Sequence, residues 1–234
     1  MKLTGNVHEV PRLSQSDITA MFRLMSEFYD NMDFDVFKKD LNAKDFCILL
    51  YDEAGKIQGF STQKILTLDI NGKQVSGLFS GDTIIHKDYW GSPELFRAFT
   101  SYFIEYAKRH EEFYWFLTSK GYKTYKIIAK FFLEFYPTFK RPTPPYEKSI
   151  MDAYASLLYP DEYDPADSVI KYKNAKDKLK KGVADITPSV LRDEDVTFFL
   201  SANPQHYNGN DLVCLAKISD NNLAPFAKKR FIGK

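Results

Sequence analysis

The segment from Leu78 to His110 constrains the fold of this chain more than any other. It opens with an apolar run that ends at Ile85, bends around Gly91, and continues into an amphipathic stretch that starts at Ser92-Pro93-Glu94. Serine is a favoured helix N-cap, and proline and an acidic residue are favoured in the first turn. A strand that leads straight into a helix start is typical of α/β proteins, and it presents backbone N–H groups to a ligand.

The sequence before this segment predicts one helix and an antiparallel meander. Ser14–Asp17 has the spacing of a capping box, and apolar residues then recur every three or four positions. We expect strands at Phe46–Tyr51 and Ile57–Leu66. Asn71-Gly72 favours a tight hairpin, after which a last strand runs to Ile85.

The sequence after it predicts a helix from Ser92, a buried strand at Phe113–Leu117 and a helix that Pro137 stops. This order favours a mixed α/β (α+β) fold: a mostly antiparallel central sheet flanked by helices, with a C-terminal extension.

The proline-rich stretch Pro142–Pro145 reads as an extended connector between two parts of the chain. We therefore expect a core domain over residues 1–140 and a C-terminal extension over residues 141–234, which could pack on the same core. In the extension we predict helices at Glu147–Leu158 and up to Lys181, and strands at Val196–Leu200 and Leu212–Ala216. Three roles are open for it: it covers a cleft, completes a second lobe, or forms a homodimer interface.

Composition narrows the class of protein. Lys and Arg number 32 against 31 Asp and Glu, and this balance argues against a nucleic-acid binder. Cys47 and Cys214 lie in apolar runs, which predicts buried reduced thiols. We expect a cytoplasmic protein without a membrane span, because the longest apolar run, Phe46–Tyr51, is far too short. The scattered histidines give no support for a metal site.

Three stretches resemble the GNAT (Gcn5-related N-acetyltransferase) superfamily, within residues 15–139. Asp52–Phe60 is similar to the family's charged hairpin, and Ile84–Gly91 to its strand and entry into the acyl-CoA loop. Ser119–Tyr122 follows an apolar strand and precedes a helix, as in the family.

The acyl-CoA loop departs from the family pattern, Arg/Gln-x-x-Gly-x-Gly/Ala. Trp90 stands at the Arg/Gln position, Pro93 at the first glycine and Leu95 at the last small residue. Glycines let backbone N–H groups approach a pyrophosphate, and proline has no N–H. The chain therefore resembles a divergent member with a degenerate pyrophosphate loop.

The resemblance implies an N-acyltransferase. Such an enzyme would move an acetyl or longer acyl group from a thioester donor, acyl-CoA or an acyl carrier protein, to the amine of a small molecule, without a metal. The alternative is a catalytically inactive binding or interaction protein on the same fold.

Aminolysis of a thioester needs a base, an oxyanion donor and an acid. Asp82 lies in an apolar strand, where burial would make a carboxylate a stronger base, although it could instead anchor a turn. His86 could relay a proton near neutral pH or be a lone exposed histidine. The resemblance implies a tyrosine as the acid, with Tyr125 the best positional match and Tyr122 the second, and packing in the core is the alternative. It also implies that the donor is bound by Thr83, Ile84, Ile85, Tyr89, Trp90, Gly91 and Ser92.

Overall fold

The computed structural model describes residues 2–173, 178–179 and 185–232. Its strands are β1 Thr4–Glu9, β2 Tyr29–Asp30, β3 Phe46–Tyr51, β4 Ile57–Ile70, β5 Lys73–Ile85, β6 Phe113–Ser119, β7 Tyr163–Asp164, β8 Val169–Ile170, β9 Lys178–Leu179 and β10 Asp211–Lys217. Its α-helices are α1 Gln15–Phe28, α2 Phe34–Asn42, α3 Glu94–Ala107, α4 Tyr122–Phe131, α5 Pro145–Leu158, α6 Glu194–Ala202 and α7 Pro225–Phe231. Short 3₁₀ turns lie at Val10–Arg12, Lys87–Tyr89, Val190–Arg192 and His206–Asn208.

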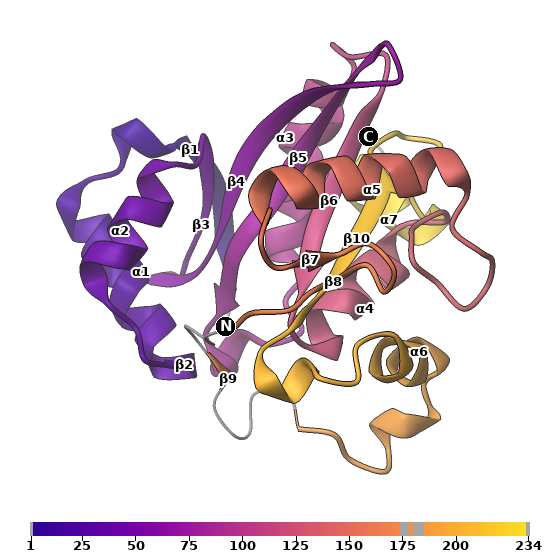
Figure 1. Cartoon of the computed structure of the whole chain (residues 1–234). Coiled ribbons are helices and arrows are strands. Elements are labelled where there is room, and N and C mark those ends of the chain that lie inside the picture. The colour runs from indigo at the N-terminus through magenta and orange to yellow at the C-terminus, as the bar shows by residue number, and fades with distance from the viewer. Residues whose placement is uncertain (1, 174–177, 180–184, 233–234) are drawn as a thin grey trace.

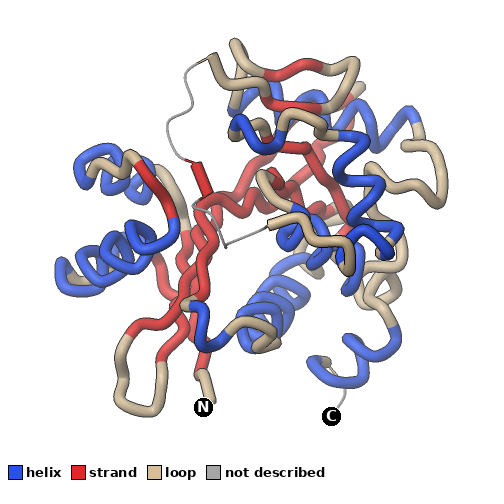
Figure 2. The backbone as a smooth tube through the Cα atoms, turned by 90° about the horizontal axis from the view of Figure 1, so that it is seen from below, coloured by secondary structure: helices blue, strands red, loops and turns tan. Residues whose placement is uncertain are grey.

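The described residues build one eight-stranded sheet in the order β1-β3-β4-β5-β6-β10-β8-β7, and β2 pairs separately with β9. Every neighbouring pair in the large sheet is antiparallel except β5 and β6, which are parallel. Helices cover both faces, with α1, α2 and α5 on one and α3, α4 and α7 on the other (Figures 1 and 2). The predicted mixed, mostly antiparallel fold is confirmed.

Alternation along β3 shows why the sheet is covered on both faces. Ile48 and Leu50 point into the cluster beneath α3, while Cys47 and Leu49 point into the cluster beneath α1 and α2. All of them are fully buried. A strand buried on both faces reads as a continuous apolar run, which is the pattern seen in the sequence. Burial raises the pKa of the Cys47 and Cys214 thiols, and both cysteines are free.

The start of α3 is tied to β1. The Glu94 carboxylate accepts a hydrogen bond from Gly5 N (2.7 Å) and pairs with Arg97, whose guanidinium also donates to Gly5 O (3.3 Å). A Cβ on Gly5 would lie 2.9 Å from Ala98 Cβ, so only glycine allows this close approach. The predicted helix start is displaced by one residue, because Pro93 is the N-cap and Ser92 Oγ accepts from Glu94 N.

The parallel pair β5 and β6 creates the feature on which the site depends. Their register runs from Ser76 opposite Phe113 to Ser80 opposite Leu117, and it ends there. Beyond Ser80, β5 continues alongside β4 as far as Ile85, whereas β6 turns into α4. The two strands therefore separate, and α3 and α4 lie over the opening (Figure 1).

A β-bulge lies at the point of separation. On β4, Ser61 is opposite Thr83 and Gln63 is opposite Ser80, so Gly81 and Asp82 together face Thr62. A bulge bends its strand and redirects side chains, which is why bulges are frequent beside functional sites.

The C-terminal part of the chain joins the same sheet, because β10 pairs with β6 over Leu212–Lys217. The strand predicted at Leu212–Ala216 is confirmed, and the division of the chain at residue 140 stays a prediction. The strand predicted at Val196–Leu200 is wrong: this stretch lies in α6, whose first turn is capped by the Asp193 carboxylate.

The helix predicted to reach Lys181 is wrong where the structure describes the chain. Val169–Ile170 and Lys178–Leu179 are strands instead. The rest of that expected helix, residues 174–177 and 180–181, lies outside the described residues. Among the described helices, none has the length and hydropathy required to cross a bilayer.

The ion pair of Glu94 and Arg97, which also binds Gly5 of β1, predicts that the stability of the protein depends on pH. Burial of the Glu94 carboxyl raises its pKa, but the hydrogen bonds from Arg97 and Gly5 outweigh this effect and hold the pKa below its usual value. A lowered folded-state pKa stabilises the protein above the ordinary glutamate pKa of about 4.3, and that stabilisation is lost as the pH falls through the lowered value.

We expect Glu94→Gln to reduce the unfolding free energy by about 1–2 kcal/mol at pH 7 and much less at pH 3. Urea denaturation at both pH values measures this difference. Glu105→Gln, which breaks an exposed pair with Lys108, is the control and should change little. An equal loss for both variants at pH 7 would contradict the assigned role of Glu94.

Candidate functional site

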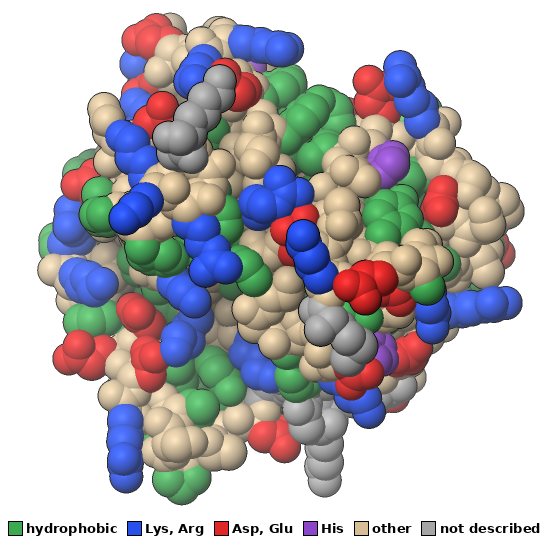
Figure 3. All heavy atoms as spheres, turned by 180° about the vertical axis from the view of Figure 1, so that it is seen from behind, with side chains coloured by type: hydrophobic (Ala, Val, Ile, Leu, Met, Phe, Trp, Pro, Cys, Tyr) green, Lys and Arg blue, Asp and Glu red, His purple; other side chains and the backbone are tan. Residues whose placement is uncertain are grey.

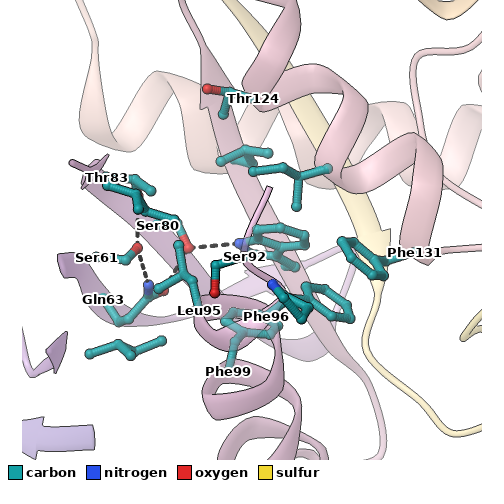
Figure 4. Close-up of a pocket in the computed structure, with 16 residues that line it drawn as sticks. Ser61, Gln63, Ser80, Thr83, Ser92, Leu95, Phe96, Phe99, Thr124 and Phe131 are labelled. Atoms are coloured by element: carbon teal, nitrogen blue, oxygen red, sulfur yellow. Dashed lines mark hydrogen bonds between the residues drawn. The ribbon is translucent and has the colours of Figure 1, made fainter. Parts of the chain in front are cut away.

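A cavity of about 90 Å³ lies where β5 and β6 separate. The strands supply one wall, which includes Ser61, Gln63, Ser80 and Thr83, and helices α3 and α4 supply the other (Figure 4). The helix side is formed mainly by Leu95, Phe96, Phe99, Ile127 and Phe131. The cavity therefore has a polar strip on its strand wall, and the rest of its lining is mostly apolar, with Ser92 and Thr124 adding two further hydroxyls.

The polar strip is a continuous chain of hydrogen bonds across three strands. In order it joins Trp115 Nε1 to Ser80 Oγ (2.7 Å), Ser80 Oγ to Gln63 Oε1 (2.6 Å), Gln63 Nε2 to Ser61 Oγ (2.7 Å), Ser61 Oγ to Thr83 Oγ1 (2.7 Å) and Thr83 Oγ1 to Gly81 O (3.3 Å). The indole of Trp115 can only donate, so every hydroxyl after it donates to the next group. The chain satisfies its own members and leaves no hydroxyl hydrogen directed into the cavity.

The edge of β5 that faces the opening carries backbone groups beyond the end of the β6 ladder. His86 N donates to Gln58 O on β4 (2.8 Å), so the peptide groups of Ile84 and His86 point toward β4. Because successive residues of a strand direct their peptide groups to opposite sides, those of Thr83 and Ile85 point toward the opening. An extended ligand with amide groups could pair with this edge.

Trp90 spans the outer end of the opening. Its indole N–H donates to Ile85 O (2.8 Å), and the Lys123 ammonium of α4 lies 3.7 Å from the centre of its ring. Burial lowers the pKa of Lys123. Trp90 thus connects the end of β5 to the start of α4. Its N–H also uses the Ile85 carbonyl, which is one of the acceptors on the open edge of β5.

Asp82 lies on the other face of the sheet from the cavity. Ile84, two residues further along β5, packs in the cluster beneath α1, and side chains two apart share a face. The Cys47 thiol has a raised pKa mainly through burial, and the Asp82 charge raises it further. Asp82 therefore sits at the bulge, on the face covered by α1.

His86 shares this face but is far from Asp82. Four residues along a strand separate side chains by roughly 13 Å. His86 Nε2 lies 3.6 Å from Glu27 Oε2 of α1, and its Nδ1 lies 3.5 Å from Asp88 Oδ2. The histidine is therefore held between carboxylates at the end of the strand.

Tyr125 lies in the core and not on the cavity. Its ring is fully buried against Phe135, Phe198 and Phe199, and its hydroxyl donates to Pro137 O (2.9 Å). Burial raises the pKa of this phenol, which makes it a poorer acid. Among the sequence-predicted catalytic residues, Tyr125 is thus separated from both Asp82 and His86 by the sheet, and the packing alternative describes its environment.

Some of the predicted donor-binding residues line the cavity, and the others lie away from it. Thr83, Ile85 and Ser92 line the cavity. Ile84 points away into the α1 cluster, Tyr89 packs at the edge of the α3 core, and Gly91 is an exposed turn residue with φ +87°. The negative charge of Glu94, which stands within the altered loop, is directed toward β1 and Arg97.

Sequence reasoning missed Gln63, Ser80 and Trp115, which build the polar strip. Gln63 and Ser80 each fall in a polar or mixed stretch of a strand, so nothing in the local pattern marks them as buried. Their juxtaposition depends on the register of three strands and on the bulge. Among the described residues, the structure has no cluster of side chains suited to hold a metal ion.

The sheet face opposite the cavity has an unusual buried hydroxyl. Thr62 Oγ1 is completely buried and has no hydrogen-bond partner among the described residues. A Cβ on Gly81 would lie 2.8 Å from this oxygen and 2.9 Å from Lys44 Cε. The bulge therefore places a polar atom and a buried lysine stem beside Gly81, the residue that precedes Asp82.

An unpaired buried hydroxyl destabilises the fold, so Thr62→Val should leave the unfolding free energy unchanged or raise it by about 1 kcal/mol. Thr100→Val is the matched control, because Thr100 Oγ1 donates to Phe96 O (2.9 Å) and its loss should cost about 1 kcal/mol. Thermal denaturation of both variants measures these changes in stability. A marked loss for Thr62→Val would mean that its hydroxyl has a partner.

Trp90→Phe keeps an aromatic ring but removes the N–H that occupies Ile85 O. An amide-bearing ligand that pairs with this edge should then bind about 2–10-fold more tightly, since one net hydrogen bond no longer competes with it. Isothermal titration calorimetry measures the change, with Tyr207→Phe, an exposed aromatic position, as the control. Unchanged or weaker binding by Trp90→Phe would contradict this competition.

Comparison with known proteins gives likeness of fold only. No protein-family model matches the sequence, and no curated protein matches it. Among solved structures, a probable N-acyltransferase from Enterococcus faecalis V583 is similar at 14% identity over 56% of this chain and 33% of its own, with a TM-score of 0.42. The chain thus matches about a third of the length of that protein.

Smaller proteins are matched over more of their length. An acetyltransferase from Trypanosoma brucei is similar at 16% identity over 61% of this chain and 98% of its own, with a TM-score of 0.41. An aminoglycoside acetyltransferase from an uncultured soil metagenomic sample, solved with sisomicin, is similar at 17% identity over 54% of this chain and 84% of its own, with a TM-score of 0.40. The mixed, mostly antiparallel sheet expected from the sequence is confirmed by the strand pairing itself, and these values assign neither donor nor acceptor.

Proposed function

We propose that this chain is a divergent GNAT-type acyltransferase that moves an acyl group from a pantetheine thioester to the amine of a small molecule. The observation that carries the proposal is the separation of parallel β5 and β6 over an apolar cavity, with the peptide groups of Thr83 and Ile85 on the open edge. A pantetheine arm is extended and contains amide groups, so it can pair with such an edge as an added strand.

The donor's charge is matched by basic side chains on the same face. Lys123 and Lys130 of α4 are exposed, as are Lys228, Lys229 and Arg230 of α7. Figure 3 shows basic side chains gathered on the half of this face where α4 and α7 lie. Because the glycine loop is replaced, ammonium groups rather than backbone N–H groups would neutralise the donor's phosphates. Acyl-CoA and an acylated carrier protein both carry a phosphorylated arm.

The acceptor would approach from the α1 face, on which Asp82 lies. Its amine attacks the thioester carbonyl, the carbon–sulfur bond breaks, and the amide forms as the thiolate leaves. The Asp82 carboxylate takes the proton that the amine loses. A thiol has a pKa near 8.5, so the thiolate can leave without a dedicated acid such as Tyr125.

One observation favours the alternative, a non-catalytic binding protein. Trp90 occupies Ile85 O and, with Lys123, spans the end of the opening where a donor arm would enter. A protein that had lost turnover could retain this arrangement as a permanent closure.

The test is to incubate the protein with acyl-CoA and acylated carrier protein, each with a panel of amines, and to measure thiol release. We expect release with at least one donor. No release and no thermal shift with either donor would contradict the proposal, whereas a thermal shift without release would favour the binding protein.

Replacement of the proposed base gives the sharper prediction. Asp82→Asn should reduce kcat/KM by about 100-fold or more while donor affinity is kept, because general-base catalysis contributes roughly 10²–10⁴-fold. Steady-state kinetics with calorimetric binding of CoA separate the two effects.

Two variants control for this experiment. Asp161→Asn changes an exposed loop aspartate and should keep full activity. Tyr125→Phe should also keep activity but lose about 1 kcal/mol of stability with its hydrogen bond to Pro137 O. Activity that survives Asp82→Asn would remove Asp82 from the mechanism.

A further inference from the structure

We propose that the cavity beneath α3 is an acyl-chain pocket, and that it selects short aliphatic acyl groups of about four carbons; this rests on the function proposed above. The position of the cavity supports it. It begins at the open edge of β5, beside Thr83 and Ile85, and extends under α3 as far as Ile48 of β3. A chain attached to a thioester at that edge would run inward, away from the acceptor's face.

The chemistry of the lining favours an apolar occupant. The helix side is mostly carbon surface from Leu95, Phe96, Phe99, Ile127 and Phe131, with hydroxyls only on Ser92 and Thr124 among its lining residues. Figure 4 shows Leu95, Phe96 and Phe99 facing the polar strip. The hydroxyl hydrogens of the strip are used, because each donates to the next group toward Gly81 O. A polar acyl substituent would give up its hydrogen bonds to water for a lining that is mostly carbon, whereas methylene groups have no such bonds to lose.

The size of the cavity sets the length of the chain. A dry cavity of about 150 Å³ in another protein holds benzene, which has six carbons. Scaled to the 90 Å³ here, the space accommodates roughly four carbons. Acetyl would leave part of the cavity empty, and octanoyl would exceed it.

The test measures binding of acetyl-, butyryl-, hexanoyl- and octanoyl-CoA. Trp115 lines the cavity, so in the Trp90→Phe background, where Trp115 is the remaining tryptophan, its fluorescence reports occupancy directly. We expect the affinity to rise about fourfold per methylene from acetyl to butyryl and then to fall. Fluorescence change should be largest for butyryl-CoA.

Two lining variants should shift this optimum in opposite directions. Ile127→Ala enlarges the cavity and should move the optimum to hexanoyl, while Leu95→Phe fills it and should move the optimum to acetyl. Ile186→Ala and Leu191→Phe make the same substitutions at exposed positions and should leave the optimum at butyryl.

The outcomes separate the pocket from the function. Affinity that is equal for all four thioesters, or that rises steadily to octanoyl, would overturn the pocket and leave the acyltransferase standing. Failure of all four to bind would overturn the pocket, and the acyltransferase would then stand or fall on thiol release from the acylated carrier protein. An optimum that neither lining variant moves would also overturn the pocket.

Discussion

The end of the hydrogen-bonded ladder between β5 and β6 is the constraint on which the rest of the site depends. Parallel strands leave both peptide edges available once they separate, and here the separation follows the pair formed by Ser80 and Leu117. Past the bulge at Gly81 and Asp82, β5 stays paired with β4, whereas β6 ends at Ser119 and the chain turns into α4. The opening is thus a consequence of backbone geometry, and α3 and α4 supply its apolar roof.

The two faces of β5 have different surroundings beyond Ser80. Thr83 and Ile85 face the cavity and the polar strip, while Asp82 and Ile84 face α1. A donor arm and an acceptor amine could therefore approach the same stretch of strand from opposite sides and meet at the bulge. This division explains why a carboxylate can lie close to an apolar cavity without destroying its apolar character.

The fold was largely predictable because its signals are local. The capping box at Ser14, the Asn71-Gly72 hairpin and the continuous apolar run of β3 each act within a few residues, and the structure contains each of them. The prediction of a strand at Val196–Leu200 was wrong because its run of apolar residues also suits a strand. Burial of Val196 and Phe199 against α4 and the N-cap at Asp193 favour a helix instead.

The candidate site was predictable only in part, and the reason is physical. Thr83 and Ser92 could be placed because they flank a recognisable strand and helix start. The chain from Trp115 to Thr83 joins residues far apart in the sequence, so it follows from register and cannot be inferred from any single motif. The direction of a side chain, as for Tyr125, depends on which helices pack around it, and α6 was not expected there.

The central claim is that the open edge of β5 binds the amide groups of a pantetheine arm. The most direct measurement is the backbone amide resonance of Thr83, followed by NMR as pantetheine and CoA are titrated in. The account predicts a downfield shift and slower hydrogen exchange of that amide with both ligands. Shifts confined to residues outside β5 and α4, with the Thr83 amide unchanged at saturation, would contradict it.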